Sequence, residues 1–217
     1  MDIQVKAQGN ASFIVSESNG YRSRDAGTVD ATAAALVPGT VMGKIVTGGA
    51  SVVADAGNTG GGTLTLDATT PVLAGAQVGD YTATCIVAAA AGGTFRVENP
   101  DGFVLGDVDV GVAFADKIAF TINDGTPDFA VGDLFTVTVA AGSGNFVRHD
   151  PAANDGSQIE AGVLYEGVSL GEVVSRTIVV RDDEVRGSDL TYAAGADAAQ
   201  ITASDAALAA LGIIVRR

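Results

Sequence analysis

The sequence contains little cysteine, histidine or tryptophan, and these shortages exclude several kinds of site. Its 217 residues include one cysteine, one histidine and no tryptophan. The single cysteine, Cys85, excludes an intramolecular disulfide and any metal site built from several cysteines. Because Cys85 lies in the alternating run Tyr81–Val87 beside apolar neighbours, we expect a buried structural thiol.

Positive charge and long apolar runs are also scarce. Twelve Lys and Arg face 26 Asp and Glu, which gives a formal net charge of -14. An acidic surface is repelled by phosphates, so direct nucleic-acid binding is disfavoured. No apolar run approaches the ~20 residues of a membrane helix, and Met1–Lys6 lacks the pattern of a signal peptide. We therefore expect a soluble protein made in the cytoplasm, without a membrane partner.

Catalytic patterns are missing as well. The one histidine, His149, stands in a polar loop before Pro151, and no Gly-x-Ser-x-Gly motif accompanies it. We therefore expect a surface loop histidine rather than a member of a Ser-His-Asp triad. The glycine run Gly57–Gly62 lacks the Lys-Ser/Thr of a phosphate-binding loop and precedes a strand-like segment. The sequence predicts no enzyme and no cofactor.

Two groups of aspartates are the alternative for a bound metal, because carboxylate oxygens are preferred calcium ligands. They are Asp101, Asp107 and Asp109, and then Asp124, Asp128 and Asp133. Neither group has the spacing of an EF-hand loop, whose acidic ligands alternate around a glycine. Aspartate in a turn usually accepts hydrogen bonds from its own backbone, so we expect that role and no metal.

What the sequence does contain is glycine, 29 residues of it, which is typical of a β-rich protein with many tight turns. Three regions differ in pattern. Residues 1–49 are an extended arm followed by short strands at 12–15 and 41–46, with a single helical turn or plain loop at 31–36. Residues 50–145 have the clearest strand pattern. Residues 146–217 combine strands with one helix.

The middle region alternates apolar and polar residues, which predicts half-buried antiparallel strands at 63–66, 118–122 and 134–139. Reversal signals separate them at Gly92–Gly93, Asn99–Gly102 and Asn123–Gly125. Such spacing predicts a small sandwich or barrel-like domain. We interpret the glycine-rich flanks, 57–62 and 142–144, as flexible connections to a parent domain.

The last region predicts strands at 163–166 and 177–181 and a helix near the end. We expect Thr202 or Ser204 to cap the helix, with Asp205 in its first turn. Gly212 ends it and an extended segment, 213–215, follows. Leu208 and Leu211 lie three apart and would face the core.

Joined together, the two outer regions resemble phage head decoration proteins of the lambda D type. The most specific segments are Pro38–Lys44, Asp155–Gln158 and Leu211–Arg216. Locally, Pro38-Gly39 and Asp155-Gly156 set turns and Gly212 stops a helix. The resemblance implies a mainly β fold: a small β-rich decoration domain with one C-terminal helix, formed by 1–49 and 146–217 and interrupted by an inserted antiparallel β-domain, 50–145.

The resemblance also implies a function without catalysis. Such proteins form homotrimers on the outer surface of the expanded head, at three-fold and quasi-three-fold sites, where they bind the major capsid protein and stabilise the shell against DNA pressure. The N-terminal arm is the usual capsid-contacting element. In this sequence the corresponding residues are Asp2, Ile3, Gln4, Val5, Lys6 and Ala7.

An alternative concerns the inserted region alone. Its threonine-bearing strand faces permit a binding module that projects outward from the virion, toward glycans or a host surface. Threonine is also an ordinary residue on the exposed face of a strand. The sequence therefore leaves both functions open, and both place the chain on the virion.

Overall fold

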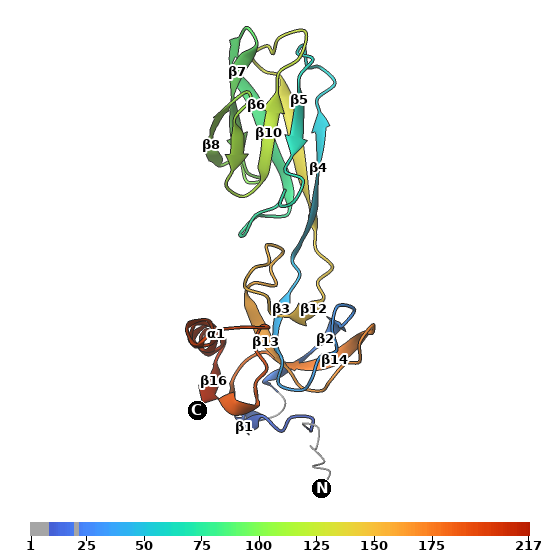
Figure 1. Cartoon of the computed structure of the whole chain (residues 1–217), viewed down its shortest axis with the longest axis vertical. Coiled ribbons are helices and arrows are strands. Elements are labelled where there is room, and N and C mark those ends of the chain that lie inside the picture. The colour runs from blue at the N-terminus through green and yellow to red at the C-terminus, as the bar shows by residue number, and fades with distance from the viewer. Residues whose placement is uncertain (1–8, 20–21) are drawn as a thin grey trace. The chain divides into compact units, whose positions relative to one another are not determined.

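A computed structural model describes residues 9–19 and 22–217. The chain folds into two compact units (Figure 1). The discontinuous unit consists of the described residues up to Ile45 together with Gly144–Arg217, and the inserted unit is Val46–Ser143. The fold is mainly β with one α-helix near the C-terminus in the described ranges, which confirms the predicted fold class.

A closed barrel forms the centre of the discontinuous unit. Around the barrel its strands are β12 (Phe146–Arg148), β2 (Arg24–Asp30), β14 (Val173–Val179), β13 (Glu160–Leu164) and β3 (Val41–Lys44). The longest ladder joins β14 to β2 antiparallel over seven residue pairs. Met42, Leu164 and Ile178 are completely or almost completely buried in the barrel and belong to one apolar cluster.

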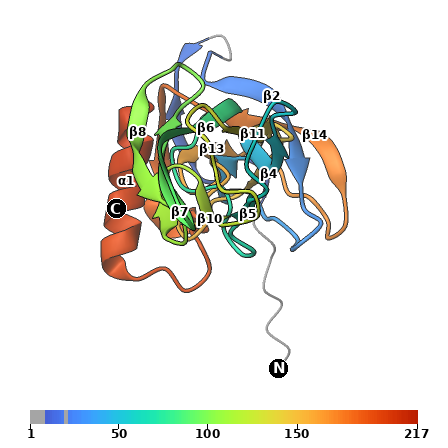
Figure 2. The same ribbon diagram turned by 90° about the horizontal axis from the view of Figure 1, so that it is seen from above.

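A three-stranded sheet and the helix complete this unit. The sheet has the order β1 (Ile14–Glu17), β15 (Asp183–Arg186) and β16 (Ile213–Arg216). The short 3-10 helix η2 (Gly187–Asp189) and then α1 (Ala198–Ala210) connect β15 to the parallel strand β16. In Figures 1 and 2, α1 lies on one side of the unit and the β2–β14 pair on the other.

The helix begins earlier than the sequence analysis predicted. Asp197 is its N-cap and forms a capping box with Gln200, so the prediction of a Thr202 or Ser204 cap was wrong. Leu208 is fully buried, as expected, but Leu211 is 36% exposed and does not join the core. Gly212, with φ +84°, follows the helix at the predicted stop.

The inserted unit has two sheets around one apolar core. The larger has the order β4 (Thr47–Ala54), β11 (Leu134–Ala141), β6 (Gly79–Ala89), β7 (Gly92–Glu98) and β8 (Val104–Asp109). The smaller has the order β5 (Thr63–Leu66), β10 (Ala119–Asn123) and β9 (Ala113–Ala115). All pairings within both sheets are antiparallel. The unit is therefore a two-sheet sandwich.

The predicted alternation is confirmed in this core. Ile118, Phe120 and Ile122 are buried, and so are Phe135, Val137 and Val139 on β11. One predicted reversal is misplaced by two residues. The turn between β6 and β7 is Ala90–Ala91, with Ala91 at φ +51°, while Gly92 and Gly93 already belong to β7.

The glycine run 57–62 is a packed part of the inserted unit, so its interpretation as a flexible connection was wrong. A Cβ on Gly62 would lie 2.1 Å from Phe129 Cζ, and one on Gly61 would lie 2.3 Å from the Thr126 carbonyl oxygen. Because a side chain at either position would collide with its neighbours, these glycines allow the chain to pass closely over Phe129. In the described ranges, no helix is long and apolar enough to span a bilayer.

Candidate functional site

The predicted capsid-contact residues, Asp2 to Ala7, lie outside the described residues. What the structure does show is how the chain that follows them is anchored. The Ala11 N–H donates to the Tyr165 carbonyl at 3.0 Å, and the Ile14 N–H to the Ala11 carbonyl at 3.0 Å. Phe13 between them is fully buried among Val185, Leu208 and Ile213. The chain from Ala11 to Ile14 is therefore held by backbone hydrogen bonds and by the buried Phe13 side chain.

The strand after this anchor is an edge strand. Within the described part of the chain, β1 pairs with β15 alone, and its register places Glu17 beside Asp183. The register shifts between Ile14 and Ser16, which marks a bulge or a similar irregularity. No strand of the described residues pairs with the other edge of β1.

Polar side chains gather where β1 ends. The Glu17 carboxylate accepts hydrogen bonds from Ser23 Oγ at 2.6 Å and Arg24 Nη2 at 2.5 Å. The Arg24 guanidinium also lies 4.3 Å from the centre of the Tyr165 ring, a cation–π distance. Burial alone would raise the pKa of Glu17, but the hydrogen bonds from Arg24 and Ser23 hold it below its ordinary value.

Asp183 is the exception in this cluster. It is 3% exposed, and neither of its carboxylate oxygens has a hydrogen-bond partner among the residues that the structure describes. Burial raises the pKa of Asp183 to about 7, and the Glu17 charge acts in the same direction. The nearby Glu184 N–H and the Arg24 charge oppose this increase only in part. The sequence analysis did not single out this residue.

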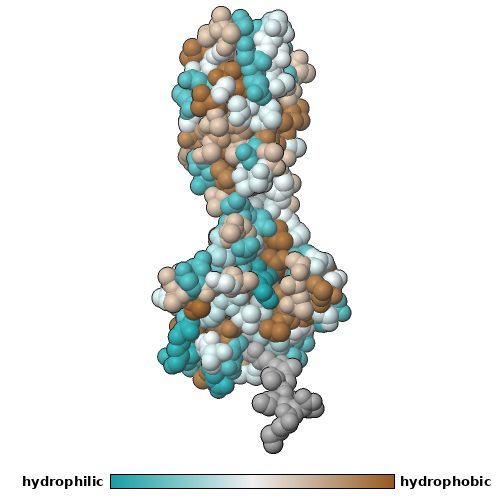
Figure 3. Space-filling view, in the orientation of Figure 1, coloured by the Kyte–Doolittle hydropathy of each residue, from teal (hydrophilic) through white to brown (hydrophobic). Residues whose placement is uncertain are grey.

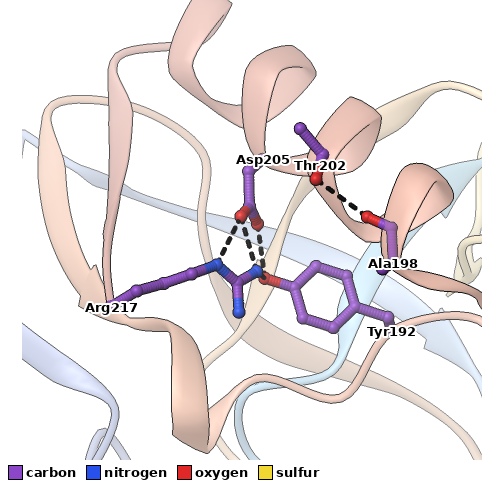
Figure 4. A network of polar contacts seen from close by, with 5 residues as sticks. All are labelled: Tyr192, Ala198, Thr202, Asp205 and Arg217. Carbon is purple, nitrogen blue, oxygen red and sulfur yellow. Dashed lines mark hydrogen bonds and ion pairs between the residues drawn. The ribbon is translucent and has the colours of Figure 1, made fainter.

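A second polar network holds the C-terminal strand to the helix (Figure 4). Asp205 on α1 accepts a hydrogen bond from the Tyr192 hydroxyl at 2.5 Å and from Arg217 Nε at 2.9 Å. Burial and the Asp205 carboxylate raise the pKa of Tyr192, so its hydroxyl stays a donor. Asp205 therefore joins Arg217 and Tyr192, whereas the sequence analysis had placed it wrongly in the first helical turn.

Two adjoining grooves lie beside the N-terminal half of α1, with volumes of about 650 Å³ and about 330 Å³. Residues that line both are His149, Pro151, Ala193, Ala196 and Gln200. Alanine is the commonest residue type in both linings, and polar or charged residues such as Arg148, His149 and Glu160 lie beside the alanines.

His149 is buried, so the prediction of a surface histidine was wrong. It is 7% exposed, and its Nε2 lies 3.1 Å from the Gln158 carbonyl and 3.3 Å from Glu160 Oε1. These contacts tie the loop after β12 to β13. Ser204 lines the smaller groove, and its buried Oγ has no hydrogen-bond partner among the described residues, His149 included.

The candidate residues of the inserted unit serve its structure. Cys85 is 1% exposed, which confirms the buried thiol, and burial raises its pKa. Asp133 accepts backbone hydrogen bonds from Thr59, Gly60 and Ala130. Burial would raise the pKa of Asp133, but these N–H donors lower it. Among residues 9–19 and 22–217, no three potential ligands are grouped as a metal site.

The surface of the inserted unit carries one further candidate, a groove of about 430 Å³ on the smaller sheet. Its lining includes Thr65, Thr121 and Asn123, and the Asn123 amide donates to Thr65 Oγ1 at 2.8 Å. On the face seen in Figure 3, apolar and polar residues are interspersed on this unit. The large apolar side chains exposed on it are Val46, Val53, Val78, Val87, Phe103, Val104, Val112 and Val131.

Similarity of the chain to curated proteins and to solved structures is absent or weak. No curated protein matches the chain. Two crystal structures of FlgL from Xanthomonas campestris, in space groups H3 and C2, are 22% identical to it, with TM-scores of 0.32 and 0.31. They match 47% and 48% of this chain, which spans only 33% and 32% of theirs. Likeness at this level does not indicate a shared fold.

One family, by contrast, matches nearly the whole chain. The sequence model of the bacteriophage lambda head decoration protein D matches residues 3–65 and 61–213. The two segments include both parts of the discontinuous unit and extend through the inserted unit. The chain therefore belongs to the family of the bacteriophage lambda head decoration protein D, and this membership indicates a role in capsid decoration.

Proposed function

We propose that the chain binds as a homotrimer to the outer surface of the expanded phage head, at three-fold and quasi-three-fold sites. There it contacts the major capsid protein through its N-terminal arm, Asp2 to Ala7, and stabilises the shell against the pressure of packaged DNA. The observation that carries this proposal is the family match over residues 3–65 and 61–213. On this proposal, 1–49 and 146–217 form the decoration domain, and 50–145 is a domain inserted into it.

The anchoring of the chain at Phe13 supports the role of the arm. An arm that adds as a strand to a capsid sheet binds through backbone hydrogen bonds, which tolerate many sequences. The force on such an arm passes into the core, because Phe13 is fully buried there. Three arms on one trimer bind together, and linked contacts raise avidity ~10²–10⁴-fold.

Binding to the expanded lattice alone also explains stabilisation. A protein that binds only one state of its partner shifts the equilibrium toward that state. At a hundredfold excess over the dissociation constant, the shift is about 2.7 kcal/mol per site. Because this free energy is gained at every occupied site, the expanded shell as a whole becomes more resistant to rupture.

Deletion of residues 2–10 tests the arm, because it removes the predicted contact residues and keeps Phe13. We expect the truncated chain to remain folded and trimeric but to lose saturable binding to undecorated expanded heads in a sedimentation assay. A chain of full length with residues 2–8 replaced by glycine and serine keeps the backbone groups of the arm, so any binding that it retains measures the part that does not depend on the side chains. Truncated protein that still saturates expanded heads would show that the arm is not the capsid contact.

A second candidate function belongs to the inserted unit: display of a glycan- or host-binding surface on the virion. The observation that favours it is the groove lined by Thr65, Thr121 and Asn123, since hydroxyl and amide groups recognise sugars. We expect the full chain to bind a subset of a glycan array or host cells, and Thr121→Arg to abolish that binding. Equal binding by the natural chain and by Thr121→Arg would show that the groove is not the binding site.

A further inference from the structure

The carboxylate of Asp183 is buried with only partial compensation from the nearby Glu184 N–H and the Arg24 charge, and the function proposed above does not use it. Within residues 9–19 and 22–217, neither of its oxygens has a hydrogen-bond partner, although the residue is only 3% exposed. Ser18, the first residue after β1, also has a buried hydroxyl without a partner. Burial of an unpaired charge is strongly unfavourable, so the closed arrangement disfavours ionised Asp183.

The elements packed around Asp183 do not supply the missing partner. From β1 comes Glu17, a second carboxylate, in direct register with it. From β2 comes Arg24, whose Nη2 is bound to Glu17. From β16 comes the apolar Ile213, and on β15 itself Glu184 is bound to Ser16 and Arg216. Among the described residues, the charges nearest to Asp183 are therefore two carboxylates and a guanidinium that one of them already binds.

We propose that Asp183 is a proton-controlled latch on the Glu17 end of β1: the protonated acid keeps this end paired with β15, and ionisation opens it. Opening brings water to the carboxylate and separates it from Glu17. The other end of the strand stays in place, because Phe13 is held in the core. The opening is therefore local and leaves the barrel intact.

The pKa of Asp183 sets the direction of the response. It is about 7 in the closed state and near the ordinary value of 3.8 once the carboxyl is hydrated. Between these values the open form releases a proton that the closed form holds, so opening becomes more favourable as pH rises. For one proton the opening constant increases about tenfold per pH unit within this window and becomes constant above it.

Hydrogen exchange on the full chain, free in solution, tests the latch. Protection factors, corrected for the pH dependence of intrinsic exchange, are measured by mass spectrometry between pH 5 and 8. We expect residues 14–18 to lose protection about tenfold per pH unit from pH 5 to 7 and then to level off. The protection of the β2–β14 ladder should not change in this way with pH. In Asp183→Asn, the protection of residues 14–18 should become independent of pH.

The neighbouring Glu184→Gln is the matched control, because Glu184 lies on the same strand but is only half-buried, with its carboxylate bound by Ser16 and Arg216. It should retain the pH dependence. Unchanged protection of β1 across the range, or the same dependence in Asp183→Asn, would overturn the latch. So would a parallel loss in the β2–β14 ladder, since that indicates global unfolding. If Asp183→Asn does not fold, the natural sequence still tests the latch: protection of residues 14–18 must depend on pH, while protection of the β2–β14 ladder must not.

The latch does not require that the chain binds a capsid. Only an effect of the latch on capsid binding would rest on the proposed function. If the arm contacts the capsid, opening at the Glu17 end leaves the residues next to the arm in place, because Phe13 lies between them and the opened end. Exchange on the free protein tests the latch, and sedimentation with expanded heads tests the arm. Failure of either experiment leaves the other proposal standing.

Discussion

Replacement of Phe95 by alanine is expected to destabilise the inserted unit by about 3–5 kcal/mol. Phe95 is fully buried, and its ring lies edge-on to Phe129 at 4.9 Å between centroids and 5.9 Å from Phe135. Its removal leaves a cavity and loses these aromatic contacts. Because a domain of this size is stable by only about 5–15 kcal/mol, the loss is a large fraction of the total.

The matched control is Phe103→Ala, since Phe103 lies in the same unit but is 69% exposed. Urea denaturation followed by hydrogen exchange separates the two units. We expect Phe95→Ala to lower the unfolding midpoint of residues 46–143 and leave that of the discontinuous unit unchanged, because the apolar clusters of that unit contain none of these residues. Equal effects of the two substitutions would contradict the burial of Phe95 in this core.

The strands of the inserted unit could be predicted because their signal is local. In Leu134–Val139, apolar and threonine residues alternate, and the structure buries Phe135, Val137 and Val139 accordingly. Asp183 could not be located in this way, because its strand, Asp183–Arg186, has one apolar residue and no alternation in its sequence. Only the structure shows that it shares a buried face with Val185.

The helix start was predictable from a pattern that the sequence analysis overlooked. Asp197 and Gln200 have the spacing of a capping box, and the structure shows both of its hydrogen bonds. Thr202 and Ser204 are also residues that cap helices, but here they lie inside α1. Thr202 donates to the Ala198 carbonyl one turn earlier, a common role of threonine within a helix.

Other features depend on contacts between segments far apart in the sequence, and no local pattern indicates them. The run 57–62 has the composition of a flexible linker, yet Phe129 and Asp133 pack against it and hold it. His149 has the sequence context of a surface loop, yet Gln158 and Glu160 enclose it. The composition of a segment indicates which conformations it can adopt in isolation. Contacts with distant segments determine which conformation it has in the folded chain.

Phe13→Ala carries the second large expected effect, a loss of about 3–5 kcal/mol in the discontinuous unit. The side chain is fully buried and joins the segment before β1 to Leu208 on the helix and Val185 on β15. We expect a lower unfolding midpoint and loss of β1 protection at every pH from 5 to 8. This pattern differs from the latch, which opens one end of the strand within a pH window.

Val15→Ala is the control for Phe13→Ala, because Val15 lies in β1 itself and is 50% exposed. It should change the free energy of unfolding by only about 0.5 kcal/mol or less, as surface substitutions do. If Phe13 anchors the arm, Phe13→Ala should also weaken binding to expanded heads, while Val15→Ala binds normally. A Phe13→Ala protein as stable as Val15→Ala would mean that the arm is not anchored in this core, and that the force on it passes elsewhere.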